Sequence, residues 1–397
     1  MRIGFLTPEF VTESYFSGGL ANYIYRTAKA LIALGHDVHV ITVSDSDSAE
    51  FDYEGIRVSR ITRSLSNGWL NMLTRNKLRS TVACIALSFA FYRKLRALHQ
   101  QSPFDIVQFS NYCFCGLFAD LLLTIPSMVR ISTYSPVWHE RLGANRSLDL
   151  RAIEWLESFQ LRRTRYMYAP SYTLKALVER GEGVTQVEVI RTPCYVETLE
   201  WDTSVYSNYI NGKDYLLFFG RFQLHKGFHI LAQALPQVFK AHPDCTAVFV
   251  GLDIDTPLAP SMKEYAQSLC QEDAGRLIFI DPLPHNQLYP IIKGARMVVL
   301  PSLVDNFPNT CLEAMALGKP VVGTNGASFE ELITEGETGF LVPVDDVNAL
   351  GEKINDVWTH PSLETIGLAA QRKVQEFTPE QTVQQLLAYC ERIVSNQ

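Results

Sequence analysis

The chain has 397 residues, which is more than one ordinary hydrophobic core accommodates, so two domains are expected. Hydrophobic residues make up 47% and charged residues 19%, a balance typical of a folded globular protein that excludes long disordered tracts. The formal net charge of −7 excludes a global basic field for nucleic acid, so any anionic ligand must be met by local groups.

The first half alternates short apolar runs with helical patterns. A strand over residues 3–6, a helix over 20–34 that Gly35 ends at its C′ position, and a strand over 37–43 form one βαβ unit. Further strands are predicted at 106–109, 128–131 and 166–169. The N-terminus has the pattern of a β-strand. It lacks the succession of charged region, apolar region and cleavage site that marks a signal peptide, so we predict no export.

The run over residues 81–92 (TVACIALSFAFY) is too short to span a bilayer. Basic residues flank it on both sides: Arg75, Lys77, Arg79, Arg93, Lys94 and Arg96. We predict a helix buried in its domain. A helix lying on a membrane surface is the alternative.

The second half restarts the same alternation at residues 215–219 (YLLFF), a continuous apolar run typical of a parallel strand covered on both faces. Further strands are predicted at 247–250, 277–280, 297–300 and 320–323. Residues 191–214 show no clean period, so we place the linker there. The stretch 379–395 reads as a terminal helix. The fold class is therefore α/β, with two doubly wound parallel-sheet domains.

Cysteine usage points away from a zinc site. The eight cysteines are scattered, and the one close pair, Cys113 and Cys115, lacks the CxxC spacing and a second pair. Reduced thiols in a cytoplasmic protein are the simplest interpretation.

The loop after the first strand carries Ser17-Gly18-Gly19 and leads into the first helix. The backbone amides of two glycines, which no side chain shields, could bind a phosphate at the N-terminus of the helix. Paired glycines can also serve steric needs alone. The loop is not the GxGxxG fingerprint, so it does not predict a dinucleotide.

Two cations follow the strand at 215–219, in Gly220-Arg221 and Lys226-Gly227. They lie at the carboxyl end of the strand, where open α/β sheets bind ligands. Arginine offers a planar fork and lysine a compact charge, so together they could neutralise a leaving diphosphate. A solvated surface pair is the alternative.

The segment 301–320 (PSLVDNFPNTCLEAMALGKP) follows the strand at 297–300. A helix is predicted to start near Pro308, with proline in its favoured first turn. Glu313, about one turn inside, could accept hydrogen bonds from the vicinal hydroxyls of a ribose, and Asp305 from a sugar ring. If each residue is considered alone, Glu313 can equally be an ordinary exposed helix residue and Asp305 a residue that favours a turn.

In combination these segments resemble the retaining GT-B glycosyltransferases of the large GT4 family, from the first strand to about Val344. The glycine loop and the cation pair resemble that family's donor-facing glycine loop and diphosphate clamp. Asp305 to Glu313 resembles its E-x7-E motif, and Gly336 with Gly339-Phe340-Leu341 resembles its closing GxxGFL turn. The resemblance implies two Rossmann-like domains facing a central cleft. Residues 1–195 would bind the acceptor, residues 196–375 would bind the donor, and residues 376–397 would form a helix that could pack back on the N-terminal domain.

The resemblance also implies residue roles. Arg221 and Lys226 would hold the diphosphate, Glu313 the ribose hydroxyls and Asp305 the transferred sugar, which makes these four the catalytic set. The remaining donor-site residues would be Gly18, Gly19, Gly220, Leu283, Asn306, Phe307, Pro308, Asn309 and Thr310. Leu283 belongs to the loop at 281–285 (DPLPH), where such enzymes seat the base.

The chain departs from the family pattern at two places. Asp305 stands where the family usually has Glu, and it reaches about 1.5 Å less far, so the sugar specificity could differ. The strand at 128–131 runs into Ser132-Thr133-Tyr134 where family members often have a His, and His139 is nearby. Acceptor-side candidates are Ser132, Tyr134, Trp138, His139 and Arg141, with core packing as the alternative for the aromatic residues.

The sequence thus predicts a retaining hexosyltransferase. It would move a sugar from a UDP- or GDP-sugar to a hydroxyl of a glycan, lipid-linked or small-molecule acceptor, in polysaccharide or glycolipid biosynthesis. No cofactor, essential metal or nucleic acid is expected, and the location would be the cytoplasm or the inner face of the membrane. Two alternatives stay open: a catalytically degenerate subunit that binds a nucleotide sugar or a partner transferase, and a nucleotide-sugar 2-epimerase.

Overall fold

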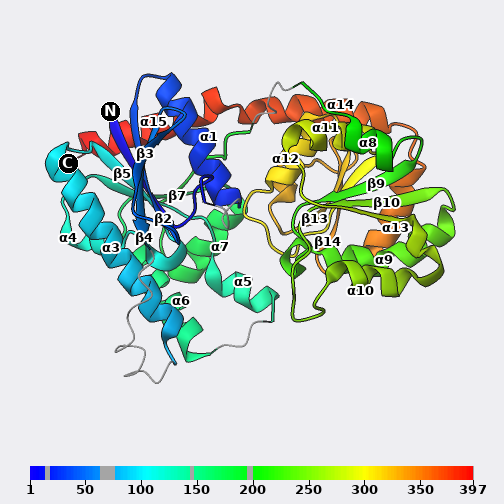
Figure 1. The fold of residues 1–397 in the computed structure, drawn as a ribbon, viewed down its shortest axis with the longest axis horizontal. Coiled ribbons are helices and arrows are strands. Elements are labelled where there is room, and N and C mark those ends of the chain that lie inside the picture. Colours follow the sequence, from blue (N-terminus) through cyan, green and yellow to red (C-terminus); the bar gives the residue numbers. More distant parts are fainter. Residues whose placement is uncertain (14–17, 63–76, 144–146, 195–199, 397) are drawn as a thin grey trace. The chain divides into compact units, whose positions relative to one another are not determined.

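The computed structural model describes residues 1–13, 18–62, 77–143, 147–194 and 200–396 (Figure 1). The chain forms two compact units. Unit 1 comprises Met1–Pro193 and Pro379–Gln397, and unit 2 comprises Cys194–Thr378. Ser17 of the glycine loop and Arg75, one of the cations before the 81–92 run, lie outside the described residues.

The described part of unit 1 contains an eight-stranded sheet in the order β3-β4-β2-β1-β5-β6-β7-β8. Neighbouring strands are parallel except β3 and β4, which form an antiparallel hairpin. The strands are β1 (Arg2–Thr7), β2 (Asp37–Ser44), β3 (Glu50–Tyr53), β4 (Ile56–Thr62), β5 (Ile106–Ser110), β6 (Ser127–Arg130), β7 (Met167–Ala169) and β8 (Val187–Val189). The strand order reverses between β1 and β5, so this unit is doubly wound.

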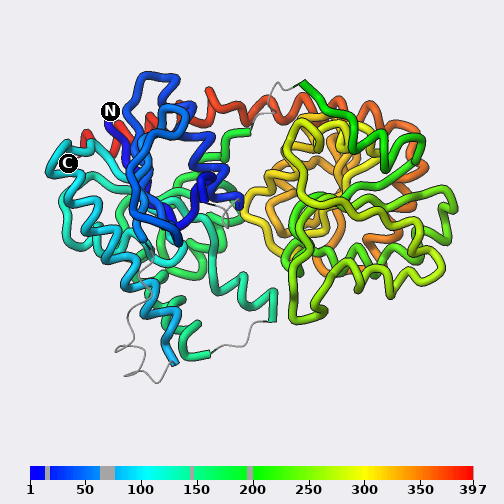
Figure 2. Tube along the Cα trace, in the orientation of Figure 1, coloured from blue at the N-terminus to red at the C-terminus, as the bar shows by residue number. Residues whose placement is uncertain are grey.

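Helices pack against the sheet of unit 1. They are α1 (Gly19–Ala33), α3 (Arg79–Gln101), α4 (Leu117–Leu122), α5 (Ser135–Arg141), α6 (Leu148–Arg163), α7 (Tyr172–Glu182) and α15 (Pro379–Ser395), with the short η1 (Tyr112–Phe114). α15 packs beside α1 (Figure 2). The side chains of Val383, Leu386 and Ile393 on α15 are buried in the same core as Ile24. The last helix of the chain therefore completes the core of unit 1.

The described part of unit 2 contains a six-stranded parallel sheet in the order β11-β10-β9-β12-β13-β14. The strands are β9 (Asp214–Phe219), β10 (Cys245–Val250), β11 (Leu277–Ile280), β12 (Met297–Leu300), β13 (Val321–Asn325) and β14 (Phe340–Pro343). The helices are α8 (Ser204–Tyr209), η2 (Leu224–Lys226), α9 (Phe228–Ala241), α10 (Met262–Cys270), η3 (Gln271–Arg276), α11 (His285–Gly294), α12 (Asn309–Ala316), η4 (Phe329–Glu331), α13 (Val347–Trp358), α14 (Leu363–Val374) and η5 (Gln375–Phe377). Here the strand order reverses between β9 and β12.

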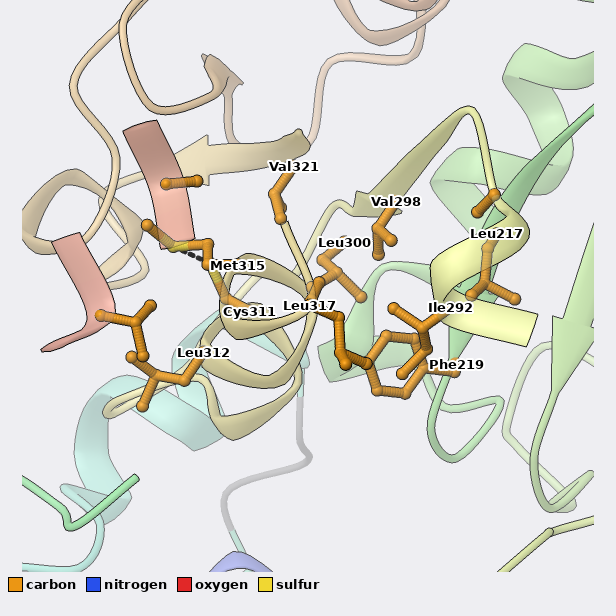
Figure 3. Close-up of a cluster of buried hydrophobic side chains, with 14 of the residues drawn as sticks. Leu217, Phe219, Ile292, Val298, Leu300, Cys311, Leu312, Met315, Leu317 and Val321 are labelled. Atoms are coloured by element: carbon orange, nitrogen blue, oxygen red, sulfur yellow. Dashed lines mark hydrogen bonds between the residues drawn. The ribbon is translucent and has the colours of Figure 1, made fainter. Parts of the chain in front are cut away.

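The core of unit 2 explains why β9 and β12 are apolar at nearly every position. Leu217 and Phe219 of β9 and Leu300 of β12 belong to one buried cluster that also contains Leu312 and Met315 of α12 (Figure 3). The remaining residues of β12 are buried as well. A parallel strand that is covered on both faces has no solvent-facing side, so the side chains on both faces are apolar. The sequence of the strand is therefore a continuous apolar run.

Every strand expected from the sequence is present, with ends shifted by at most a few residues. The prediction of an irregular linker over residues 191–214 was wrong in part, because α8 lies inside it. Its six residues bury no side chain, so no hydrophobic period marks them. Pro308 is the residue before α12 rather than part of its first turn. The β3–β4 hairpin, β8 and β14 were not predicted.

The run at 81–92 lies within the longer helix α3, which has a buried face that includes Val82, Phe91 and Leu95. Ile85 and Phe89 of the same helix are exposed, at 37% and 44%. In the described parts of the chain, no helix combines the length and the apolarity needed to cross a bilayer.

Candidate active site

The loops that follow β9 and β12 meet where the sheet of unit 2 reverses its order. The carbonyl of His225 accepts hydrogen bonds from the amides of Leu303 at 2.8 Å and Val304 at 3.4 Å. Gly227 has a φ of +68°, and a Cβ at this position would lie 1.7 Å from the carbonyl oxygen of Pro301. Only glycine fits such a backbone contact. The two loops are therefore joined through their backbones.

An ion pair links the same two loops. The Nζ of Lys226 lies 2.6 Å from an Oδ of Asp305, and the two side chains are 30% and 10% exposed. The Oγ of Ser328 donates to the carbonyl of Asp305 at 3.1 Å, which anchors that residue to the start of η4. An ammonium group carries three donors, so Lys226 can bind a further anion without releasing Asp305.

Arg221 supplies a second positive charge to this place. Its partly exposed guanidinium forms no ion pair or hydrogen bond with the described residues. Burial, together with the charges of Lys226 and Arg221, lowers the pKa of His225 to about 3, so its imidazole is neutral at physiological pH. The β9–α9 loop thus presents arginine and lysine charges beside a neutral histidine.

The N-terminus of α12 lies next to these cations. A Cβ at Gly220 would lie 3.9 Å from Cγ2 of Thr310, in the first turn of α12. No side chain of the described residues caps the helix, and its first turn has no acidic residue. Among the described residues, nothing accepts a hydrogen bond from the amides of Asn309 and Thr310. A helix N-terminus with open amides attracts anions, so the helix adds to the positive field of the loop.

The other donor-side candidates lie around this point in different ways. Glu313 lies on α12 and is only 8% exposed, which excludes the interpretation as an ordinary exposed helix residue. Phe307 is buried, with its ring 5.7 Å from that of Phe377, so its side chain belongs to the core. Asn306 is partly exposed. Leu283 follows β11 and packs partly buried against the core of unit 2.

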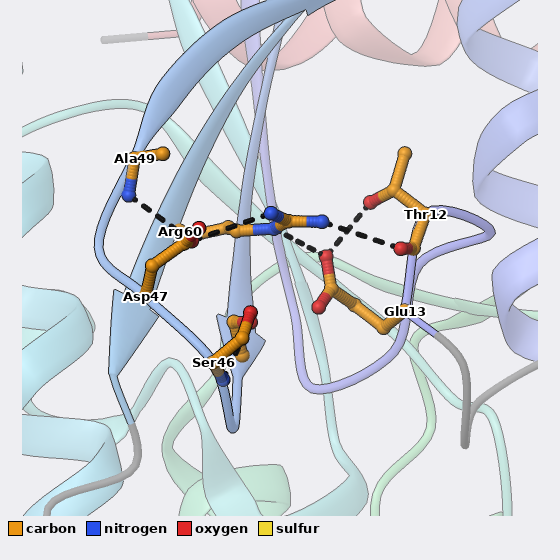
Figure 4. A network of polar contacts seen from close by, with 7 residues as sticks. Thr12, Glu13, Ser46, Asp47, Ala49 and Arg60 are labelled. Carbon is orange, nitrogen blue, oxygen red and sulfur yellow. Dashed lines mark hydrogen bonds and ion pairs between the residues drawn. The ribbon is translucent and has the colours of Figure 1, made fainter.

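In unit 1, Gly18 is the residue before α1, and within the described ranges no side chain caps that helix. A Cβ at Gly18 would lie 3.0 Å from an Oε of Glu9, so a carboxylate is already close to this helix N-terminus. Arg60 of β4 fixes the preceding loop, since it donates to Oε1 of Glu13 at 2.7 Å and to the carbonyl of Thr12 at 3.3 Å (Figure 4). The proximity of Glu9 to the start of α1 was not predicted from the sequence.

The segment after β6 is held by an asparagine that the sequence analysis missed. Oδ1 of Asn111 accepts from the amide of Ser132, and its Nδ2 donates to the carbonyl of Thr133, both at 2.7 Å. Arg130, 6% exposed, donates to Oγ of Ser132 at 3.0 Å. Its guanidinium carbon lies 3.8 Å from the ring centre of Tyr23. Ser132 is thus fixed from two sides.

The acceptor-side candidates after Ser132 do not form one cluster. Tyr134 is 8% exposed and donates to Glu182 at 3.1 Å, and burial raises the pKa of its hydroxyl. It is a core residue. Trp138, His139 and Arg141 lie on α5, where Nδ1 of His139 is 2.7 Å from Oε1 of Glu154 on α6. That contact orients the imidazole.

Glu157 of α6 is a buried titratable group that the sequence analysis did not single out. It is 4% exposed, accepts from the amide of Cys113 at 3.2 Å and also accepts from the hydroxyl of Ser135. Burial raises its pKa to about 7. The only signal in the sequence was its spacing of three from Glu154, which places both on one side of a helix.

Two further features concern cysteines and metals. All eight cysteines lie among the described residues, and all are free thiols. Within the described ranges, no group of three or more His, Cys, Asp and Glu side chains is placed to hold a metal ion.

Two family models match the chain in succession. Residues 17–197 match the model of Glycosyltransferase Family 4, and residues 205–373 match that of Glycosyl transferases group 1. The chain belongs to the GT4 glycosyltransferases. The group 1 model spans Arg221, Lys226, Asp305 and Glu313, whereas the Family 4 model spans the glycine loop and the acceptor-side candidates.

Relatives of this glycosyltransferase match over most of its length. A glycogen synthase of Mycobacterium tuberculosis is 24% identical and matches over 90% of this chain and 85% of that protein. A D-inositol 3-phosphate glycosyltransferase of Corynebacterium diphtheriae is also 24% identical, over 91% of this chain and 87% of that protein. These matches, together with the family models, identify the glycosyltransferase as an enzyme.

Solved structures share the fold of this glycosyltransferase. Sucrose-phosphate synthase from Thermosynechococcus elongatus has a TM-score of 0.81 at 19% identity, covering 100% of both chains. Anabaena HepE in complex with UDP and glucose has a TM-score of 0.71 at 20% identity, covering 98% of both chains. The two-sheet architecture is therefore the GT-B fold.

Proposed function

We propose that this glycosyltransferase moves a hexose from a UDP- or GDP-sugar to a hydroxyl group with retention of anomeric configuration. One observation carries the proposal: Arg221, Lys226 and the open N-terminus of α12 converge at the strand reversal of unit 2. Two cations and free amides suit a diphosphate. The structural neighbour Anabaena HepE, in complex with UDP and glucose, supports the choice of nucleotide.

Charge stabilisation by the chain's own groups would drive the transfer. In the proposed step the bond from the anomeric carbon to the diphosphate breaks, and the acceptor oxygen bonds to that carbon on the same face. The acceptor proton passes to the departing diphosphate, whose charge Arg221 and Lys226 would stabilise. Asp305 is paired with Lys226, which lowers its strength as a nucleophile and favours a role in holding the sugar. Buried Glu313 would accept from the ribose hydroxyls.

The acceptor and its location are proposals of the same kind. The names of the relatives, glycogen synthase and D-inositol 3-phosphate glycosyltransferase, support a glycan or a small polyol as acceptor. A lipid-linked acceptor used at the cytoplasmic face of the membrane is also consistent with the exposed side chains of α3. Polysaccharide or glycolipid synthesis would then be the biological role.

Nucleotide binding tests the donor site. Thermal unfolding is measured with UDP, GDP, ADP and CMP for the wild type and for Arg221→Ala with Lys226→Ala. Ligand at about a hundred times its dissociation constant stabilises by about 2.7 kcal/mol, so one nucleotide should raise the midpoint of the wild type only. Lys213→Ala with Lys240→Ala, two exposed lysines of unit 2, removes the same charge elsewhere and should keep the shift. The donor site is refuted if no nucleotide stabilises the wild type.

The reaction itself is tested with the sugar form of the nucleotide that binds. The anomeric configuration of the product, read by NMR, should match that of the donor, and activity should survive EDTA. An inverted product would rule out retention. Loss of activity with EDTA, restored by a divalent cation, would rule out a metal-independent reaction.

A further inference from the structure

The outward face of α6 carries side chains that usually lie inside a protein. Leu148, Trp155 and Phe159 are 62%, 64% and 40% exposed. The rings of Trp155 and Phe159, one turn apart, are stacked with their centroids 5.7 Å apart. A contiguous exposed apolar patch on a folded protein marks a contact surface.

Positive and negative side chains lie on different sides of α6. All its other exposed residues are arginines: Arg151, Arg162 and Arg163. Arg162 is 61% exposed even though it also contacts Glu182. The helix is therefore apolar and cationic toward solvent.

The acidic residues of α6 are engaged inside unit 1. Asp149 accepts from the amides of Ser80 and Thr81, Glu154 contacts His139, and Glu157 is buried. This is the reverse of an ordinary surface helix, which keeps its charges of both signs outside.

The starts of α3 and α6 are fastened together. The carboxylate of Asp149, in the first turn of α6, lies 2.9 Å from the amide of Ser80 and 2.8 Å from that of Thr81, in the first turn of α3. Exposed Lys77 and Arg79 therefore lie near Leu148. The two helix starts extend the cationic and apolar character of the α6 face.

We propose that the α6 face, comprising Leu148, Arg151, Trp155, Phe159, Arg162 and Arg163, docks on an anionic lipid surface. Such a surface offers negative headgroups above an apolar layer, which matches arginines interleaved with aromatic rings. The net charge of −7 opposes binding elsewhere on the molecule, so a local face of this kind is required. The inference rests on the proposed function only in that docking would bring the transferase to a membrane-borne acceptor.

Vesicle cosedimentation of the full chain tests the proposal. Vesicles are phosphatidylcholine alone, or equal parts of phosphatidylcholine and phosphatidylglycerol. The wild type should partition onto the anionic vesicles only. Trp155→Ala with Phe159→Ala should weaken partitioning at least about tenfold. Arg151→Gln with Arg163→Gln should weaken it about fivefold per arginine.

Matched variants locate the contact. Trp201→Ala, at a 42% exposed tryptophan of unit 2, should partition as the wild type does. Ile85→Ala with Phe89→Ala tests α3 by the same measure and should have the smaller effect. Quenching of tryptophan fluorescence by brominated lipids should occur in the wild type and be largely lost in Trp155→Phe.

Two results would overturn the proposal: no partitioning of the wild type, or equal partitioning of the wild type and Trp155→Ala with Phe159→Ala. A larger effect of the α3 variant would also overturn it, because the contact would then lie on α3. The UDP-dependent thermal shift is measured on the same preparations. A retained shift without partitioning removes only the membrane contact, and partitioning without a shift removes only the donor site.

Discussion

The ion pair between Lys226 and Asp305 places opposite charges where a diphosphate is expected. The pair is mostly shielded from water, at 30% and 10% side-chain exposure, so its charges are screened less than those of a surface pair. Asp305 therefore has two opposed effects: it holds the lysine in place and it repels an incoming anion. Which effect dominates can be measured.

Asp305→Asn is expected to raise UDP affinity about tenfold, because a repulsive carboxylate is removed from Lys226. It should lower the rate of sugar transfer, because a neutral amide is the weaker partner for a sugar hydroxyl. Calorimetry with UDP and a transfer assay separate the two. Lower UDP affinity in Asp305→Asn would show instead that the carboxylate mainly positions Lys226.

Glu157 makes the stability of unit 1 depend on pH. Its pKa rises from 4.5 to about 7 in the folded protein, so between these values the folded carboxyl keeps a proton that the unfolded one loses. The contribution of the protonated Glu157 carboxyl to stability is full below pH 4.5, is lost as the pH rises toward 7 and changes no further above that value. Glu157→Gln should match the wild type at pH 4.5 and exceed it by about 2–3 kcal/mol at pH 8.

Calorimetric unfolding of unit 1 across this pH range checks the effect of Glu157. Glu140→Gln, at an exposed position of α5, should follow the wild type throughout. A constant difference between Glu157→Gln and the wild type at all pH values would contradict the assignment.

The sequence indicated some of these residues and could not indicate others. Arg221, Lys226 and Asp305 directly follow recognisable strands, and the carboxyl ends of parallel strands share one edge, so their convergence could be anticipated. The burial and the contacts of Glu157 and Arg130 depend on which helix covers which strand. That information arises only when distant segments pack, and a single sequence carries no local pattern for it.

At the scale of elements, the joint between the loops after β9 and β12 decides the shape of the proposed donor site. Those loops were expected to lie close, but the backbone bonds from His225 to Leu303 and Val304 were not foreseeable from side-chain patterns. Long apolar strands were found reliably. The short helix α8 was missed because none of its six residues is buried, so it carries no hydrophobic period.

Gly227→Ala should disrupt this joint. The new methyl group would collide with the carbonyl of Pro301 at a φ of +68°, which L residues rarely adopt. We expect a loss of about 2 kcal/mol or more in the stability of unit 2, with a weaker UDP shift. Gly275→Ala, where no heavy atom lies within 4 Å, is the control and should behave as the wild type. Unchanged stability and UDP binding in Gly227→Ala would argue against a rigid joint.

At the scale of the whole molecule, the C-terminal helix α15 is part of the hydrophobic core of unit 1, which the N-terminal half of the chain forms. Val383, Leu386, Cys390 and Ile393 of α15 are each at most 2% exposed, and the hydroxyl of Tyr389 donates to the carbonyl of Met167 at 3.2 Å. A fully buried aliphatic side chain contributes about 1.5–3 kcal/mol. The helix therefore contributes much of the free energy of unfolding of unit 1.

A chain that ends at Thr378 should lose the cooperative unfolding transition of unit 1 and keep the UDP-dependent shift of unit 2. Differential scanning calorimetry resolves the two, and a chain ending at Ser395 serves as the control. If the chain ending at Thr378 kept a normal transition of unit 1, α15 would be dispensable for that core.

The backbone hydrogen bond between Cys194 and Phe377 has a consequence for how the gene of such a protein can be rearranged. The amide of Cys194 donates to the carbonyl of Phe377 at 2.8 Å, so the two ends of unit 2, which runs from Cys194 to Thr378, adjoin. Unit 2 is thus a continuous cassette inserted into unit 1, with its two ends at one point. Adjacent ends would allow such a cassette to be exchanged for another of the same kind without stretching the chain. On the proposed assignment of the donor to unit 2 and the acceptor to unit 1, that exchange would give the acceptor-binding unit a different sugar donor.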